Sequence, residues 1–327
     1  MNVSLNLLSK YRMELMGVGT LLILIWHAYG NNARMPYLLE RIVDNAQIGV
    51  DLFLLLSGIR ISYSLSKTVV GGGDISVKSW YWQRLKRIYV PFIIIMLLYY
   101  LYTIPFEDKT IKFAILDIST IGWWISGIGA WYISLILFLY VIAPVLYKIL
   151  YKGKYKWWIL SVLIIAIWII FQDDPNSIFH YVTNAIKRSP SFLIGISIAP
   201  LIQKDVKVNL PVLLILSATL FFIGYIALPL GFCKWMLILP ISLIIAKFIE
   251  WLPAFKGFLS FLGVISLESY LTNITLGDIL NHKSWIICGY DLSYGHYLEY
   301  TIVVLVGILL AWICNRLSNK IMRAKIN

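Results

Sequence analysis

The chain has 327 residues, of which 60% are hydrophobic and only 13% are charged, and its mean hydropathy is +0.81. Soluble domains carry about 25% charged residues, so this composition excludes an ordinary soluble protein and indicates a polytopic membrane protein. The formal net charge of +12 would suit a nucleic-acid partner, but the distribution of the basic residues argues against one.

Apolar segments of nearly bilayer-spanning length recur along the whole chain, since a spanning helix needs about 20 mainly apolar residues. A chain in lipid must satisfy its own backbone hydrogen bonds, which favours helices over strands. We therefore expect an all-α protein that forms a single transmembrane domain over residues 1–327. About ten helices are predicted, at 14–31, 47–66, 86–104, 129–150, 156–171, 189–203, 209–230, 232–251, 257–279 and 298–318. The fifth and sixth are short enough to be tilted or partly re-entrant.

Lysine and arginine residues concentrate in alternate loops between these segments. Nineteen fall in one set of loops and eight in the other, while Arg60 lies inside the second predicted helix. Cytoplasmic loops are enriched in basic residues, so both termini are predicted to be cytoplasmic, which agrees with an even number of helices. The basic residues thus indicate orientation and contact with membrane lipid, and we expect no nucleic-acid partner. The opening sequence MNVSLNLLSKYR lacks the order of a signal peptide, so the first helix is expected to remain as an anchor.

The three cysteines indicate neither a disulfide framework nor a metal site. Cys233, Cys288 and Cys314 lie in separate segments without CxxC spacing. No set of His, Cys and Asp residues has the spacing of metal ligands, and we predict that no metal is bound.

Five titratable groups lie within predicted spans, where charge is costly and usually functional: Glu14, His27, Asp51, Arg60 and Glu268. Asp51 begins the second helix, so helix capping explains it as well as function does. Glu14 lies at the mouth of the first helix, where solvent can reach it. His27 either bonds a neighbouring helix or acts as a base, because neutral imidazole accepts a proton near neutral pH. Arg60 keeps its charge and needs an anion, from a ligand or from another helix.

The third helix begins with the basic and aromatic sequence WYWQRLKRIYVPF. Arg84 and Arg87 are three residues apart and therefore share nearly one helix face. With Lys86 and Trp82, they either anchor the helix at the cytoplasmic interface or clamp a phosphorylated cofactor. Guanidinium groups suit the second role because they match phosphate oxygens bidentately.

The order of these motifs resembles the membrane-bound acyltransferase-3 family, the bacterial O-acyltransferases that modify surface glycans, from about residue 12 to residue 275. His27 matches the family histidine of the first helix, and Arg84 with Arg87 matches its Arg-x-x-Arg pair. Two further motifs, GVDLFFxLSG and SxxxYLxH, are matched at Gly49, Asp51, Phe53, Ser57, Gly58, Ser266, Tyr270 and Leu271.

The resemblance implies a multi-pass protein of the bacterial inner membrane that transfers an acyl group, usually acetyl, from cytoplasmic acyl-CoA. The acceptor would be a hydroxyl of a surface glycan or of a lipid-linked oligosaccharide. His27 would be the general base, and Arg84, Arg87 and Lys86 would hold CoA phosphates. Arg60 or Arg12 would stabilise the oxyanion. Direct transfer is favoured over an acyl-enzyme on a second-helix serine such as Ser57.

Two positions depart from the family pattern. Met16 stands where the family usually has a cation, with ten residues between it and the histidine, and Arg12, one helical turn earlier, or Arg60 can substitute for it. Asn273 stands where the late motif often ends in histidine. The alternatives are a glycan exporter and a non-catalytic family member, although a transporter would more often show repeat symmetry between its halves.

Overall fold

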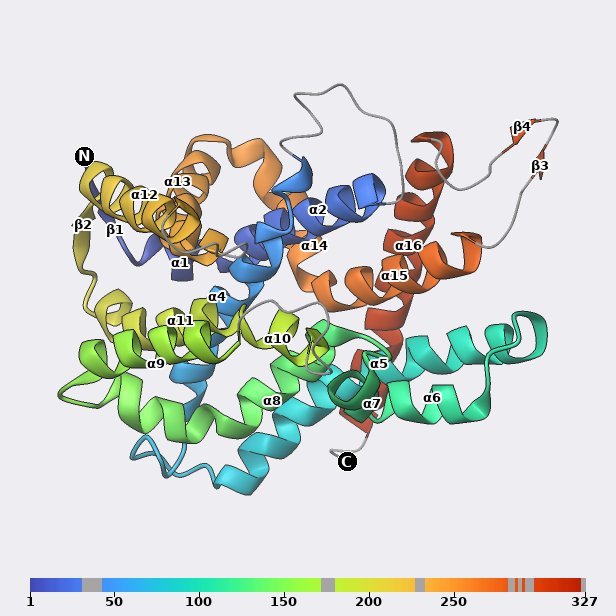
Figure 1. Ribbon diagram of the computed structural model, residues 1–327, viewed down its shortest axis with the longest axis horizontal. Helices are drawn as coiled ribbons and strands as arrows, with labels where there is room; N and C mark the ends of the chain where they lie inside the picture. The colour runs from blue at the N-terminus through green and yellow to red at the C-terminus, as the bar shows by residue number, and fades with distance from the viewer. Residues whose placement is uncertain are drawn as a thin grey trace.

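The computed structural model describes residues 1–30, 43–171, 180–226, 233–281, 286–287, 290–291 and 297–324, and these residues are almost all helical (Figure 1). Two short antiparallel pairs are the strands among them: β1 (Asn2–Ser4) with β2 (Lys207–Asn209), and β3 (Ile286–Ile287) with β4 (Tyr290–Asp291). The predicted all-α class is confirmed. Cys288 and parts of the predicted segments, at 31, 227–230 and 232, lie outside the described residues.

Each of the ten predicted segments contains a helix in the described part of the chain. In order these are α2 (Arg12–Gly30), α4 (Ile48–Leu65), α5 (Val77–Phe106), α8 (Trp131–Leu146), α9 (Lys156–Ile170), α11 (Ser189–Gln203), α12 (Leu210–Ile226), α13 (Ile238–Trp251), α15 (Ser266–Asn281) and α16 (Tyr297–Ala324). Shorter helices connect them: α1 (Leu7–Lys10), α6 (Ile111–Ile118), α7 (Ile121–Ser126), η1 (Tyr147–Tyr151), α10 (His180–Ile186), η2 (Cys233–Leu237), η3 (Pro253–Phe255) and α14 (Lys256–Val264).

Within the described residues, five helices are long and apolar enough to cross a membrane: Ile48–Leu65, Val77–Phe106, Trp131–Tyr151, His180–Gln203 and Thr301–Arg323. A sixth is added if Lys234–Trp251 and Pro253–Val264, which meet at a bend of 101°, form one span. Pro253 explains that bend, because proline cannot continue the hydrogen-bond ladder of α13. The protein is thus a multi-pass membrane protein. The count of ten spans, the single domain over 1–327 and the cytoplasmic placement of both termini stay predictions.

Glycines let two helix pairs approach at backbone distance. A Cβ added to Gly17 of α2 would lie 2.0 Å from the carbonyl oxygen of Leu259 in α14. A Cβ added to Gly58 of α4 would lie 2.3 Å from the carbonyl oxygen of Phe192 in α11. Small residues favour helix association in membranes because they permit such contact. These crossings fix α2 and α4, which supply much of the site described below.

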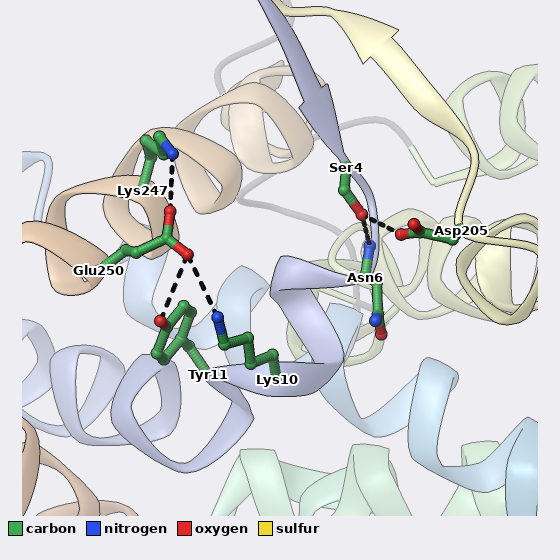
Figure 2. A network of polar contacts seen from close by, with 7 residues as sticks. All are labelled: Ser4, Asn6, Lys10, Tyr11, Asp205, Lys247 and Glu250. Carbon is green, nitrogen blue, oxygen red and sulfur yellow. Dashed lines mark hydrogen bonds and ion pairs between the residues drawn. The ribbon is translucent and has the colours of Figure 1, made fainter.

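Polar contacts at Glu250 of α13 tie down the N-terminal segment (Figure 2). The Glu250 carboxylate accepts hydrogen bonds from Lys10 Nζ at 3.2 Å and from Tyr11 Oη at 3.5 Å, and Lys247 Nζ lies 2.6 Å from its second oxygen. Tyr11 is 5% exposed. Because Arg12 follows directly, this network fixes the first residue of α2.

Candidate functional site

A cavity of about 510 Å³ lies among α2, α4, α5, α8, α14, α15 and α16. Its lining includes both exposed and buried residues. The exposed residues, which mark the open end, include Arg60, Gln83, Arg87 and Asn319. The lining residues of α2 and α4 that lie farthest from Arg12 and Arg60 are Ile23, Val50 and Phe53, which are buried and mark the closed end. Along α4 the lining runs from Val50 to Arg60, about 15 Å at a rise of 1.5 Å per residue.

Four arginines from three helices line this cavity: Arg12 of α2, Arg60 of α4, and Arg84 and Arg87 of α5. Arg12 lies within electrostatic range of the other three. Among the described residues none of the four forms an ion pair. In the same part of the chain, the buried Nε atoms of Arg12 and Arg84 have no hydrogen-bond partner. Like charges this close, with unsatisfied donors, form a site that a polyanionic ligand would stabilise.

Ser64 of α4 orients Arg84 of α5. Arg84 donates to Ser64 Oγ through Nη2, and Trp80 Nε1 donates to the same oxygen at 2.9 Å. The prediction that Arg84 and Arg87 share a helix face is confirmed, since both line the cavity. Lys86 is not among the lining residues, and its Nζ lies 4.9 Å from the centroid of the Trp82 ring.

His27 lies beyond the closed end of the cavity. It follows the lining residue Ile23 by one helical turn on the same face of α2. Its Nδ1 is 2.7 Å from Oδ1 of Asn273 in α15, and its ring centroid is 6.2 Å from that of Tyr270, which lines the cavity. An amide oxygen only accepts, so Nδ1 carries the proton and the lone pair of the neutral ring is on Nε2.

The structure separates the arginines from the histidine. Arg12 and His27 are fifteen residues apart on α2, about 22 Å along the helix axis. Arg12 and Arg60 therefore lie with Arg84 and Arg87 rather than beside His27, which favours ligand binding over stabilisation of an oxyanion. Ser57 and Tyr132 both line the intervening cavity wall.

Glu268 lines the cavity from α15 with only 5% of its surface exposed. It accepts a hydrogen bond at 2.9 Å from Asn315 Nδ2 of α16, and Asn315 Oδ1 accepts one at 3.0 Å from Asn319 Nδ2. Sequence analysis identified Glu268 but missed both asparagines. Their spacing of four residues, which places them on one helix face, was the signal available.

Asp51 is 2% exposed and does not line the cavity. One carboxylate oxygen pairs with Arg188 Nη1 at 2.9 Å and the other accepts from Ser191 Oγ at 3.0 Å. The helix-capping interpretation is replaced by an ion pair that ties α4 to Arg188, the residue that precedes α11. In the sequence, Arg188 is one of the eight basic residues of the less basic set of loops, and nothing there indicates this ion pair. Glu14, in the first turn of α2, does not line the cavity either.

Among the described residues no group of three His, Cys, Asp or Glu side chains could hold a metal ion. The predicted absence of a metal therefore stays a prediction.

Comparison with known families decides the class of the protein. The family model for the acyltransferase-3 domain, described as an acyltransferase domain, matches residues 15–316. The chain belongs to the acyltransferase-3 family. This acyltransferase-3 protein is accordingly a membrane acyltransferase, and the resemblance seen in its motifs is confirmed. Arg12 and Asn319 lie just outside the matched residues. Neither a curated protein nor a solved structure gave a match.

Proposed function

We propose that the protein transfers an acyl group, acetyl in the simplest case, from acyl-CoA to a hydroxyl of a surface or exported polysaccharide at the bacterial inner membrane. The observation that carries the proposal is the arrangement of cations and histidine at opposite ends of one cavity. Four arginines without ion pairs among the described residues stand at the open end of a cavity, and the His27–Asn273 pair lies past its closed end.

Acyl-CoA fits the cavity by charge and by length. Its phosphates would bind the arginines, since guanidinium donors match phosphate oxygens and the buried Nε atoms of Arg12 and Arg84 need acceptors. The rest of the donor is an extended thioester arm, which would follow the apolar wall toward Tyr270. The separation of about 22 Å between Arg12 and His27 then suits an elongated donor that binds through phosphates at one end and reacts at a thioester at the other. Arg12 and Arg60 would together replace the cation missing at Met16.

The reaction needs a base at the far end. His27 would accept the proton of the acceptor hydroxyl at Nε2 while Asn273 holds Nδ1–H. The hydroxyl oxygen attacks the thioester carbon, the C–S bond breaks, and the CoA thiolate leaves and recovers the proton from His27. General-base help of this kind is worth roughly 10²–10⁴ in rate. The hydroxyl groups of Tyr132 and Tyr270, whose side chains both line the cavity, would donate hydrogen bonds to the oxyanion.

Direct transfer remains favoured over an acyl-enzyme. Ser57 is the serine of α4 that lines the cavity, and Tyr132, which also lines it, is no base at neutral pH and could not activate a serine nucleophile. The partners of the reaction are thus acyl-CoA, a surface glycan or lipid-linked oligosaccharide, and the surrounding lipid.

The test is transfer of isotope-labelled acetyl from acetyl-CoA to host surface glycans, in membranes from a host that lacks related enzymes, followed by mass spectrometry. We expect labelling by the parent, a loss of at least 100-fold in His27→Ala and a strong loss in Arg84→Ala/Arg87→Ala. The matched control is His180→Ala, because His180 lies on α10 outside the cavity, and it should label like the parent. Equal labelling by His27→Ala and parent would exclude His27 as the base. No labelling with any donor would favour an exporter or a non-catalytic member.

A further inference from the structure

One face of α16 lines the open end of the cavity with uncharged residues, which have no evident part in binding phosphate. Asn315, Asn319 and Met322 follow one another by four and three residues and all line the cavity. Asn319 is exposed, whereas Asn315 and Met322 are half-buried. The arginines line the same cavity from α2, α4 and α5. A ligand whose phosphates bind the arginines would therefore lie beside these α16 residues.

The hydrogen bonds fix which way the two amides point. The Glu268 carboxylate only accepts, so the Asn315 group that contacts it at 2.9 Å must be the Nδ2 donor. Asn315 Oδ1 then faces Asn319 and accepts from its Nδ2 at 3.0 Å. This chain of bonds starts at a carboxylate that is only 5% exposed, so it settles the amide assignments that would otherwise be ambiguous. Asn319 keeps a second N–H and its carbonyl oxygen for a ligand at the open end.

A side-chain amide that offers one donor and one acceptor is complementary to the edge of adenine. It accepts from the exocyclic N6–H and donates to N7, the bidentate pairing by which asparagine reads adenine. Hypoxanthine and guanine carry an acceptor oxygen in place of the N6 donor, so the same amide meets an acceptor with its own oxygen. Met322, one turn beyond Asn319, offers the polarisable apolar surface that a flat base can contact.

We propose that Asn319, held in orientation by Asn315 and Glu268, reads the adenine base of the acyl-CoA donor. The proposal rests on the proposed function and adds a specificity residue to it. Asn319 lies three residues beyond residue 316, where the family match ends. Its recognition of the base divides the donor site in two, with arginines that bind phosphate and an α16 face that selects the base.

Competition binding to the purified full-length protein in lipid nanodiscs tests the assignment. Radiolabelled CoA is displaced by CoA or by a CoA analogue with hypoxanthine in place of adenine. For the parent we expect CoA to displace at a concentration roughly 5- to 150-fold lower than the analogue, the value of one bidentate contact. In Asn319→Ala the affinity for CoA should fall to that for the analogue, so that the two compounds displace the label at equal concentrations. Lys320→Ala, an exposed neighbour that does not line the cavity, should keep the preference.

The outcomes separate this inference from the function beneath it. Arg84→Ala/Arg87→Ala should lower the affinities for CoA and for the analogue by the same factor. The ratio of their displacing concentrations should therefore stay unchanged. Equal displacement by CoA and the analogue in the parent, or a preference that survives in Asn319→Ala, would overturn the reading of adenine while CoA binding still supports the acyltransferase. Absence of any CoA binding by the parent would overturn both.

Discussion

Asn273 shows how a departure from a family pattern can serve the same chemistry. It stands where the late motif often has histidine, yet its amide oxygen lies 2.7 Å from His27 Nδ1. An amide oxygen is an acceptor at every pH, so it selects the tautomer with the proton on Nδ1 and the lone pair on Nε2. Asn273 is 3% exposed, which shields this hydrogen bond from water. The substitution is therefore compatible with a working base.

Removal of this contact should slow transfer without weakening donor binding. We expect Asn273→Ala to lower the transfer rate by about tenfold or more, because a hydrogen bond that holds a base is worth about 1–3 kcal/mol when its partner is left buried. The KM for acyl-CoA should stay the same, since the arginines are far away. Asn273→His, which restores the family residue, should recover much of the rate. Parent-like rates in Asn273→Ala, measured at matched expression, would show that His27 needs no orienting partner.

Sequence reasoning at the residue scale worked where partners are close in the chain. The three-residue spacing of Arg84 and Arg87 was enough to place both on one face. The partners of His27 and of Asp51 are 246 and 137 residues away, and one sequence carries no signal of such pairing. The merging of Arg12 and Arg60 with the α5 arginines depends on how three helices cross, so only the structure shows it.

Glycine contacts determine where the helices of the site stand. Gly17 of α2 packs directly on the backbone of α14. Helix α2 also carries Arg12 at its first residue and His27 in its last turn. We expect Gly17→Ala to push α2 away from α14, with a loss of about 1–3 kcal/mol in stability and weaker binding of CoA. Gly257→Ala is the matched control, because an added Cβ there meets nothing within 4 Å. Thermal unfolding and CoA binding measure both effects, and equal results for the two variants would refute this account of the packing.

Apolar length located the helices but not all of their ends. Apolar content placed the start of the third segment at residue 86 and the WYWQRLKRIYVPF motif placed it at residue 80. In the structure α5 begins at Val77, where the Ser76 side chain accepts from the backbone of Ser79 at 3.2 Å. Hydropathy detects the lipid-embedded part of a helix and misses a polar first turn. The predicted segment 257–279 is divided at Ile265 into α14 and α15, a break that its hydropathy does not indicate.

At the scale of the whole molecule, the two ends of the cavity differ in the residues that surround them. Its open end gathers the arginines, the first residue of α2, the early turns of α5 and the last turns of α16. Two groups of the basic residues assigned to the cytoplasm, those around the start of α5 and those in the last turns of α16, lie at that same end. Because basic loops face the cytoplasm, an acyl-CoA site at this end would draw its donor from the cytoplasm. His27, at the other end of α2, would meet an acceptor from the opposite side.

Labelling of introduced cysteines tests that direction. Lys78 precedes the arginines on α5, Lys320 lies near the end of α16, and Lys112 lies on α6 beyond the other end of α5; all three are exposed. In a variant whose natural cysteines are replaced by serine, a membrane-impermeant maleimide should label Lys112→Cys on intact spheroplasts. Lys78→Cys and Lys320→Cys should be labelled only after permeabilisation, because the 30-residue α5 is about 45 Å long and carries its two ends to opposite faces of the bilayer. The reverse pattern would place the arginines outside the cell, where acyl-CoA is absent, and would contradict the donor site together with the orientation.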